Sequence, residues 1–542
     1  MLKKNTYHKV TVTDMNDLGY GVARVDGIVV FVDGGVTGDE LEIKIIKAAK
    51  DYGVARIEKI ITPSNHRVSP DCAVFPRCGG CTFRHVSREY ELKLKRELVV
   101  SAFHKNGVDA TVNEVVTDGN VSGYRNKAQY PIDENGNIGY YARHSHTVIP
   151  CDRCDLTAPQ LSEIASFVSD YIKIKKWSVK HIYLRIAEKT GQIMTCLVTP
   201  NEALDGEKEF AEALTTRFPN VVSVILNIHP EETNVILGKK IKVLYGTDRI
   251  EDILCECKFG ISSLSFYQVN RSCAELLYNE AIKRAGDAKK VADLYCGAGT
   301  IGISFAKSRP DASVLGIEII PQAVENAKQN AALNGIKNAT FICADAMTAP
   351  LDGFDCIFVD PPRKGLSREL VDRMCRLAPK KIVYVSCDPS TLARDAKILV
   401  DSGYEMGTVT PVDMFPRTGH VETVVCLSRQ IDVHKMKLNS APFEMIKRGE
   451  KTIELRLFDE KRRQIKVGDK IVFTNTLNGE TLEKTAVKLH HFDSFEELYK
   501  SLPLLKCGYT VNDIDNAKPS DMEQYYSRGE QKKYGVVGIE LY

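Results

Sequence analysis

The chain has 542 residues, which at ~100–200 residues per domain predicts three to five domains. Hydrophobic residues make up 43% and charged residues 27%, close to the globular average, which argues against wholesale disorder. With 73 Lys and Arg against 71 Asp and Glu, the net charge of +2 excludes a histone-like polycation but allows local basic patches that bind nucleic acid.

The sequence contains no run of about 18 apolar residues, and its N-terminus lacks the apolar core of a signal peptide. We therefore expect a cytoplasmic protein without membrane contact. Its 16 cysteines are too sparse for a disulfide framework in a chain of this length. Several of them cluster, and in a reducing compartment clustered cysteines indicate a metal site or catalysis.

Short β-rich runs separated by glycine turns open the chain and predict a small barrel. These runs cover residues 8–13, 22–25, 28–32, 40–47 and 52–61. A cysteine-rich turn segment follows between Cys72 and Cys81, and the pattern of residues 87–105 predicts an amphipathic helix.

The middle of the chain mixes strands with helices up to residue 285, and residues 288–428 then repeat strand followed by helix. This alternation predicts a doubly wound parallel sheet. The strands expected in that sheet are residues 290–295, 313–317, 339–343, 356–359 and 381–386. A break near Gln430 opens a last, strand-rich module.

A glycine-rich loop follows the first strand of this sheet. Gly297, Gly299 and Gly302 satisfy G-x-G-x-x-G, and Glu318 ends the next strand, where its carboxylate can accept both hydroxyls of a ribose. The motif fits dinucleotides and S-adenosylmethionine alike, so an NAD-dependent oxidoreductase stays open at this point. The later turn Asp360-Pro-Pro-Arg-Lys-Gly365 lies at the carboxyl end of a strand and is typical of S-adenosylmethionine enzymes that act on planar bases.

Cys387 directly follows the strand 381–386 and precedes a helix that begins at Asp388-Pro389. We expect the positive end of this helix to favour the thiolate form of Cys387. A thiolate that adds to C6 of uracil activates C5 for methylation, and a base must then remove the C5 proton. The turn that begins at Phe415 carries two candidate bases, His420 and Glu422. We interpret Cys296, in the glycine loop, as structural.

These segments resemble the bacterial RNA uracil-5 methyltransferases that use S-adenosylmethionine, over roughly residues 1–430. The resemblance implies that Cys387 is the nucleophile and Glu422 the proton-removing base. It also implies a set of residues that bind S-adenosylmethionine: Gln268, Tyr295, Glu318, Asp345 and Asp360. The related 5-methylcytosine enzymes carry an extra cysteine where this chain has Pro361-Pro362-Arg363, so cytosine is disfavoured as the target.

The resemblance implies a multidomain α/β protein. We expect an OB-like β-barrel of the TRAM type at residues 1–62, then an iron–sulfur segment and a central α/β RNA-binding domain at 63–285. A Rossmann-like methyltransferase domain follows at 286–430. Residues 432–542 resemble ASCH domains, which are PUA-like β-barrels, through Gly449-Glu-Lys451-Thr-Ile-Glu454-Leu-Arg456. Some ASCH enzymes hydrolyse modified nucleosides with a threonine where this chain has Glu454, so we expect an RNA-holding role here instead.

The cysteine cluster admits two interpretations. Cys78 and Cys81 could pair with Cys151 and Cys154 around zinc, although the gap between the pairs is far longer than in an ordinary zinc ribbon. The family resemblance instead implies a 4Fe-4S cluster held by Cys72, Cys78, Cys81 and Cys154, with Cys151 as a spare.

RNA contacts are expected where aromatic and basic residues interleave, at residues 123–130 and at Phe83-Arg84-His85, with solvated strands as the alternative. The target base must be flipped out or single-stranded to reach Cys387. By the resemblance, a monomer methylates C5 of a uridine in 23S ribosomal RNA, because the transfer-RNA branch of the family typically lacks the cluster. A transfer-RNA uracil-5 methyltransferase and a non-catalytic iron–sulfur protein that binds RNA or senses redox state remain alternatives.

Overall fold

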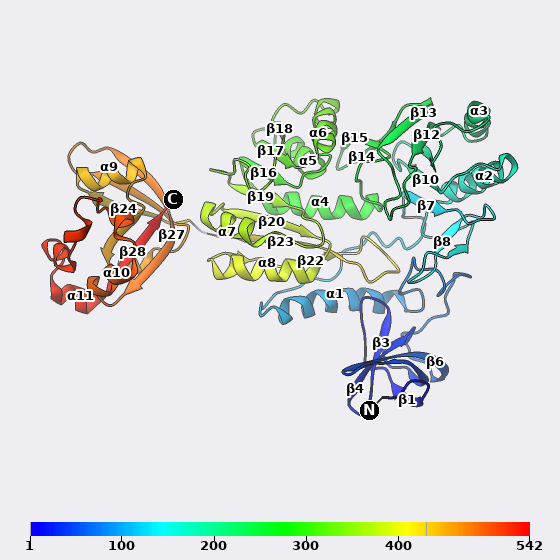
Figure 1. Cartoon of the computed structure of the whole chain (residues 1–542), viewed down its shortest axis with the longest axis horizontal. Coiled ribbons are helices and arrows are strands. Elements are labelled where there is room, and N and C mark those ends of the chain that lie inside the picture. The colour runs from blue at the N-terminus through cyan, green and yellow to red at the C-terminus, as the bar shows by residue number, and fades with distance from the viewer. Residues whose placement is uncertain (1, 430) are drawn as a thin grey trace.

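The computed structural model describes residues 2–429 and 431–542, and the predicted domain limits at Met1 and Gln430 lie outside these ranges. Figure 1 shows an N-terminal β-sheet body below the long helix α1, two α/β bodies above it, and a C-terminal body set apart at one end. Within the described ranges, no helix is both long and apolar enough to cross a membrane.

The N-terminal body is a six-stranded sheet with the order β1-β5-β6-β4-β3-β2. Alternating residues such as Val30, Val32, Leu41 and Ile43 form its core. The sequence predicted five strands, and the strand it missed, β2, has only two residues, too few for an alternating pattern. The strands are β1 Tyr7–Thr11, β2 Asp14–Met15, β3 Tyr20–Val25, β4 Ile28–Asp33, β5 Glu40–Ala48 and β6 Tyr52–Thr62.

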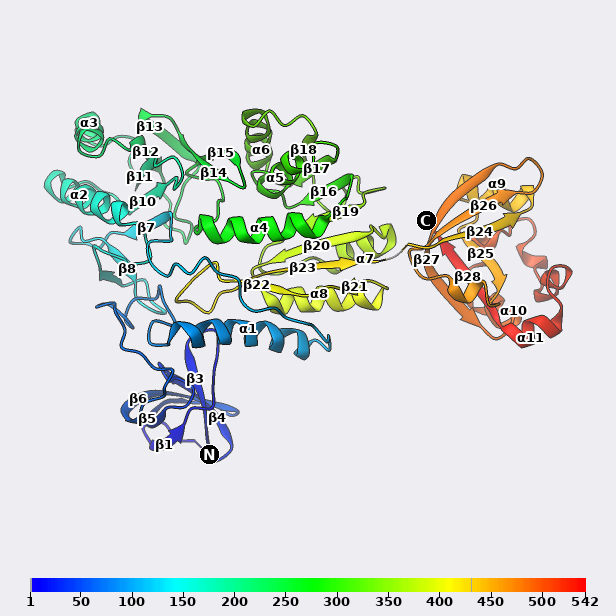
Figure 2. The same cartoon turned by 180° about the vertical axis from the view of Figure 1, so that it is seen from behind.

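Helix α1 (Arg88–Lys105) lies between the N-terminal sheet and the helix α8 (Pro389–Asp401), as both views show (Figures 1 and 2). Its predicted first residue, Ser87, is the N-cap, whose side chain accepts the N–H of Tyr90. The helix therefore joins the first body to the last helix of the large sheet.

The central body has a five-stranded sheet with the order β13-β12-β11-β10-β7, covered by the helices α2 and α3. Two hairpins, β8–β9 and β14–β15, complete it. The elements are β7 Lys127–Pro131, β8 Gly139–Tyr141, β9 Val148–Pro150, α2 Pro159–Lys175, β10 His181–Ile186, β11 Ile193–Thr199, α3 Glu207–Arg217, β12 Val221–Ile228, β13 Lys240–Gly246, β14 Arg249–Leu254 and β15 Cys257–Ser262.

The large sheet follows the order β18-β17-β16-β19-β20-β23-β21, and β22 also pairs with β23. Its first five strands are parallel, as predicted, but β23 runs antiparallel to β20, β21 and β22. The predicted five parallel strands are confirmed, and the antiparallel strand β23 at this edge was not predicted. Only a short turn joins β22 to β23, and a parallel pair would need a longer crossover.

The elements of this body are α4 Arg271–Ala285, β16 Lys290–Leu294, α5 Thr300–Ser308, β17 Ser313–Glu318, α6 Pro321–Leu333, β18 Ala339–Cys343, β19 Cys356–Val359, α7 Arg368–Leu377, β20 Lys381–Ser386, α8, β21 Glu405–Met406, β22 Thr410–Val412 and β23 Glu422–Ser428. Because the five parallel strands share one direction, their carboxyl ends all meet at one edge of the sheet.

The C-terminal body is a five-stranded sheet with the order β24-β26-β27-β28-β25. It touches the large-sheet body through α7 and β27, and the Arg429 guanidinium donates to the Val467 carbonyl. Its main elements are β24 Val433–Leu438, α9 Ser440–Arg448, β25 Ile453–Leu457, β26 Lys470–Asn475, β27 Thr481–Phe492, α10 Phe495–Ser501, α11 Arg528–Tyr534 and β28 Val536–Leu541.

Candidate functional site

The glycine loop after β16 adopts the conformations that its sequence predicts. Tyr295, Gly297 and Gly299 have positive φ values of 61°, 53° and 81°. The N–H of Gly302 donates to Asp293 Oδ2 over 2.9 Å, and a Cβ at Gly302 would lie 2.8 Å from that oxygen. A Cβ at Gly297 would meet nothing within 4 Å. The loop is therefore packed tightly against its own strand and open on the side of Gly297.

The carboxyl edge of the sheet gathers the predicted site residues. Glu318 ends β17 and Asp360 follows β19, while the others follow the neighbouring strands: Tyr295 after β16, Asp345 after β18 and Cys387 after β20. Gln268 reaches this region from the segment before α4 and is buried. Sequence reasoning missed Tyr278, which is buried on α4. Burial raises the pKa of its hydroxyl, the charge of Asp360 raises it further, and hydrogen bonding to Thr300 and Gln268 opposes the rise.

Two carboxylates border the glycine loop. Glu318 Oε2 accepts the N–H of Gly297 over 3.2 Å, and its Oε1 accepts the N–H groups of Ile319 and Ile320. Asp345 is exposed and binds only the N–H of Met347, two residues on. Acceptors therefore lie along the open side of the loop, where a ribose could bind.

The register of β20 and β23 places Cys387 and Glu422 at adjoining ends of these two strands. Ser386 pairs with Thr423, and the Thr423 hydroxyl donates to the Ser386 carbonyl over 3.0 Å. Cys387 directly follows Ser386, and Glu422 directly precedes Thr423. Glu422 is the first residue of β23 rather than part of the preceding turn, and only 4% of its surface is exposed.

The acidic groups at this edge have displaced pKa values. Burial raises the pKa of Glu422 to about 8, with a smaller contribution from Asp360. Desolvation also raises the pKa of Asp360 to about 7. Burial raises the pKa of the Cys387 thiol to about 11, and the carboxylates of Glu422 and Asp360 add to this effect.

The expected thiolate at Cys387 is therefore wrong for the protein without substrate. The helix start that was to stabilise it is already satisfied, since Asp388 Oδ1 accepts the N–H groups of Ser390 and Thr391 over 2.9 and 3.1 Å. An anion thus occupies the positive end of α8. Among the groups that act on Cys387, only the Arg363 cation and a backbone N–H lower the pKa.

His420, the other candidate base, is exposed. It lines a cavity of about 290 Å³ that Cys387 also lines. Arg363 of the Asp360 turn also lines this cavity, together with two residues that no local sequence pattern indicated: Asp17 from the N-terminal body and Lys105 from α1.

The Asp360 turn is fixed by Asp395 on α8, another residue that sequence reasoning gave no role. Asp395 is 1% exposed, and its Oδ2 accepts the N–H of Leu366 over 2.9 Å and the hydroxyl of Tyr384 over 2.8 Å. The buried carboxylate therefore ties the turn both to the strand and to the helix on either side of Cys387.

Five cysteine thiols line a second cavity, of about 170 Å³. Its lining also includes four cations, Arg84, Arg125, Lys127 and Arg153, and burial lowers the pKa of Lys127 to about 8. In residues 2–429 and 431–542, no three candidate ligands lie close enough to hold a single metal ion. The thiols that line the cavity are Cys72, Cys78, Cys81, Cys151 and Cys154.

The two expected RNA-contact segments are largely buried. Phe83, Arg84 and His85 are each less than 5% exposed, as are Tyr124 and Tyr130. The Tyr124 hydroxyl donates to the Pro416 carbonyl over 2.9 Å. The prediction was wrong for these residues, because interleaved aromatic and basic side chains can also be buried in the fold, as they are here in a turn and in the segment that leads into β7.

The family described as tRNA (Uracil-5-)-methyltransferase matches residues 88–430, which is more than half of the chain. The protein belongs to this family. A TRAM domain matches residues 2–57 and an ASCH domain residues 436–542, so the expected family and both accessory domains are confirmed. Since the family consists of S-adenosylmethionine-dependent RNA uracil-5 methyltransferases, the oxidoreductase alternative is wrong.

Curated relatives match over nearly their whole length. An uncharacterized RNA methyltransferase of Clostridium tetani is 40% identical over 457 residues, which cover 80% of this chain and 99% of the relative. One of Listeria innocua is 39% identical over 450 residues, with 79% and 99% covered.

A solved structure also matches. The Pyrococcus abyssi tRNA (uracil-54, C5)-methyltransferase in complex with S-adenosyl-L-homocysteine is 28% identical and superposes with a TM-score of 0.65. The match covers 78% of this chain and all of that one.

Proposed function

We propose that this methyltransferase transfers a methyl group from S-adenosylmethionine to C5 of a specific uridine in RNA through a covalent adduct between Cys387 and C6. The observation that carries the proposal is the pairing of Ser386 with Thr423, which sets a thiol beside a buried carboxyl at the ligand-binding edge of the sheet. The open glycine loop lies on the same edge.

The reaction follows from these two groups. The Cys387 thiol first loses its proton to solvent; the thiolate Sγ then bonds to C6, and the C5–C6 π electrons move into an enolate. C5 then bonds to the methyl carbon of the sulfonium, whose S–CH₃ bond breaks and leaves S-adenosylhomocysteine. Glu422 takes the C5 proton, the C–H electrons restore the C5–C6 double bond, and the Cys387 sulfur departs.

Glu422 is the proposed base rather than His420. Its pKa of about 8 lies near neutral pH. Part of the protein then carries the carboxylate form, and this carboxylate is basic enough to accept a proton. Its position beside Cys387 in the sheet register also brings it close to C5 of a base bonded to that sulfur. His420 is exposed at the cavity mouth.

The proposed binding site for S-adenosylmethionine is the glycine loop with five neighbouring side chains. The bond from Gly297 to Glu318 keeps a carboxylate next to the open face of the loop, which supports ribose binding there. The five residues are Gln268, Tyr295, Glu318, Asp345 and Asp360.

The thiol-lined cavity fits a 4Fe-4S cluster better than zinc. Five thiols line the one cavity, more than the four that a 4Fe-4S cluster needs. The buried Nε atoms of Arg84 and Arg125 have no partner among the described residues, although Arg84 also pairs with Asp71, and an anionic cluster would offer acceptors for both nitrogens. When bound, the cluster would supply four iron–thiolate bonds that tie the Cys72–Cys81 segment to the central body.

We propose Cys72, Cys78, Cys81 and Cys154 as the ligands of the cluster. Cys151 is the spare, since its thiol already donates to the Arg153 carbonyl over 3.0 Å.

The proposed substrate is 23S ribosomal RNA, by the family likeness of the cysteine segment, with transfer RNA as the second candidate because a transfer-RNA enzyme is among the solved structures that match. The C-terminal body is proposed to hold RNA. A cavity of about 380 Å³ there is lined by Lys437 and Arg456 beside Tyr509, Tyr525 and Tyr526, residue types that hold phosphates and stack on bases.

Deleting the gene and mapping 5-methyluridine in total RNA tests the proposal. We expect one or more sites in 23S RNA to lose the methyl group, and a plasmid copy with Cys387→Ala not to restore it. Loss confined to a transfer RNA would support the second candidate. An unchanged 5-methyluridine map would contradict the proposal.

A further inference from the structure

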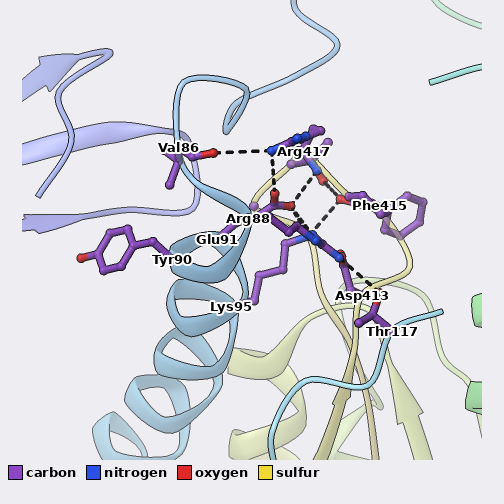
Figure 3. A network of polar contacts seen from close by, with 12 residues as sticks. Val86, Arg88, Tyr90, Glu91, Lys95, Thr117, Asp413, Phe415 and Arg417 are labelled. Atoms are coloured by element: carbon purple, nitrogen blue, oxygen red, sulfur yellow. Dashed lines mark hydrogen bonds and ion pairs between the residues drawn. The ribbon is translucent and has the colours of Figure 1, made fainter. Parts of the chain in front are cut away.

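The turn between β22 and β23 is held by side chains from outside the large sheet. It runs from Asp413 to Val421 and leads directly into Glu422. Figure 3 shows how helix α1 faces this turn with a row of charged residues. The partners are 318 or more positions apart in sequence, so this contact belongs to the tertiary fold alone.

Lys95 is the centre of the contact. Its side chain is fully buried, and its ammonium group donates to Asp413 Oδ1 and, over 2.9 Å, to the Phe415 carbonyl. Arg88 binds the other carboxylate oxygen of Asp413. One lysine thus fixes both a side chain at the beginning of the turn and a backbone carbonyl two residues later.

Glu91, one helical turn before Lys95, holds the next part of the turn. It is fully buried, and its Oε1 accepts the backbone N–H of Arg417 over 2.6 Å. The same oxygen lies 3.0 Å from Arg88 and 3.4 Å from Lys95. Arg417 has a positive φ of 68°, a strained conformation for a residue with a side chain, and this bond helps to maintain it.

The segment after Cys81 also forms hydrogen bonds with the turn. The N–H groups of Thr82 and Phe83 both donate to the Arg417 carbonyl over 3.0 Å, and Thr82 Oγ1 accepts the N–H of Gly419 over 3.0 Å. Gly419 also lies against the backbone of Asp17, because a Cβ there would come within 1.9 Å of the Asp17 carbonyl oxygen.

Burying these charged groups costs desolvation free energy, which makes the network a poor way to stabilise the fold alone. Three cations, Arg88, Lys95 and Arg417, surround two buried carboxylates, and apolar residues of similar volume often replace such networks without loss of stability. What the charges do provide is a fixed geometry, since Arg88, Lys95 and Glu91 each bind a specific atom of the turn. The atoms so fixed lie five to nine residues before Glu422.

We propose that Lys95 and Glu91 are positioning residues for the removal of the C5 proton: through the Asp413–Gly419 turn they hold Glu422 against the base bonded to Cys387. The proposal rests on the proposed function and adds to it a dependence of one step on helix α1. A shift of about 1 Å in a reacting group can cost about 10²-fold in rate.

The variant Lys95→Met tests this, with Lys93→Met as the matched control. Lys93 lies on the same helix but is exposed, 3.8 Å from Glu97. We expect Lys95→Met to keep single-turnover methyl transfer, to lose about 10²-fold in kcat, and to accumulate a covalent adduct with ordinary RNA. Lys93→Met should match the wild type. Equal losses in methyl transfer and turnover, without adduct, would overturn the proposal.

If Lys95→Met does not fold, a comparison of Glu91→Gln with Glu91→Ala tests the same proposal. The glutamine retains an oxygen for the N–H of Arg417 and should retain most of kcat, whereas the alanine should accumulate adduct. Equal kcat in the two variants would contradict the positioning role. A wild-type protein that forms no adduct with 5-fluorouridine RNA would instead refute the proposed function, which separates the two failures.

Discussion

Ser386 and Thr423 face each other in the antiparallel pair of β20 and β23, and the hydroxyl of the second donates to the carbonyl of the first. This one register places Cys387 and Glu422, the proposed nucleophile and base, at adjoining strand ends. A shift of the register by one residue would turn the Glu422 side chain to the opposite face of the sheet. Catalytic geometry in this protein therefore depends on strand pairing as much as on the residues themselves.

Glu422→Gln should stall the reaction after methyl transfer. The amide cannot take the C5 proton, so the methylated base stays bonded to Cys387 and a protein–RNA adduct accumulates with ordinary RNA. Denaturing gel electrophoresis with labelled RNA measures it. His420→Ala should turn over without accumulating adduct, and the reverse pattern would move the base role to His420.

The same substitution should make the Cys387 thiol more acidic. The negative charge of Glu422 disfavours the thiolate and contributes to the raised pKa of Cys387, so a neutral glutamine lowers that pKa while the effect of burial remains. At a fixed pH near 9, Cys387 in Glu422→Gln should react faster with iodoacetamide, as followed by mass spectrometry of its peptide. Glu405→Gln, an exposed change in the same body, should leave the rate unaltered. Slower alkylation in Glu422→Gln would contradict this account.

Asp293 should make the stability of the protein fall as pH rises. Burial raises the pKa of Asp293 from 3.8 to about 7, so the folded state binds more protons than the unfolded state within that window. Stability is therefore lost as pH rises from about 4 to about 7, by about 4 kcal/mol at most for this group. Asp293→Asn should raise Tm more at pH 8 than at pH 5.

Asp287→Asn is the control for this measurement, because Asp287 is fully exposed at the start of the same strand region. It should show no such pH dependence. A larger gain in Tm for Asp293→Asn at pH 5 than at pH 8 would reverse the sign and contradict the assignment of a protonated Asp293.

Protein purified without oxygen should contain iron and sulfide in the ratio of a 4Fe-4S cluster. Cys72→Ala and Cys154→Ala remove proposed ligands and should lose both elements, whereas Cys151→Ala removes only the spare thiol and should keep them. Stoichiometric zinc in the wild type would contradict the cluster. Loss of iron in Cys151→Ala would contradict the choice of ligands.

The sequence predicted features that depend on neighbouring residues. The five parallel strands, the glycine loop after the first of them, and helix α1 follow from local periodicity and from the spacing of glycines. Family resemblance identified the candidate site residues, and the structure gathers Cys387 and Glu422 at one edge.

Features that depend on distant contacts were not predictable. Lys95 has the sequence context of a surface lysine, and only the approach of Asp413 shows that it is buried. Tyr124 and Arg84 were predicted as RNA contacts because a pattern of residue types does not show which side chains the rest of the fold covers. The raised pKa of Cys387 likewise arises from burial in the folded protein, with a further contribution from carboxylates that follow or begin other strands.

The covalent adduct is the most direct test of the central claim. RNA containing 5-fluorouridine should trap the protein in the presence of S-adenosylmethionine, because fluorine at C5 cannot be removed as a proton is. After digestion, mass spectrometry should find the nucleotide on the peptide that contains Cys387. Cys343→Ala, an exposed cysteine on the same sheet, should form the adduct normally, and Cys387→Ala should form none. An adduct on Cys387→Ala, or one attached to another cysteine, would contradict the account.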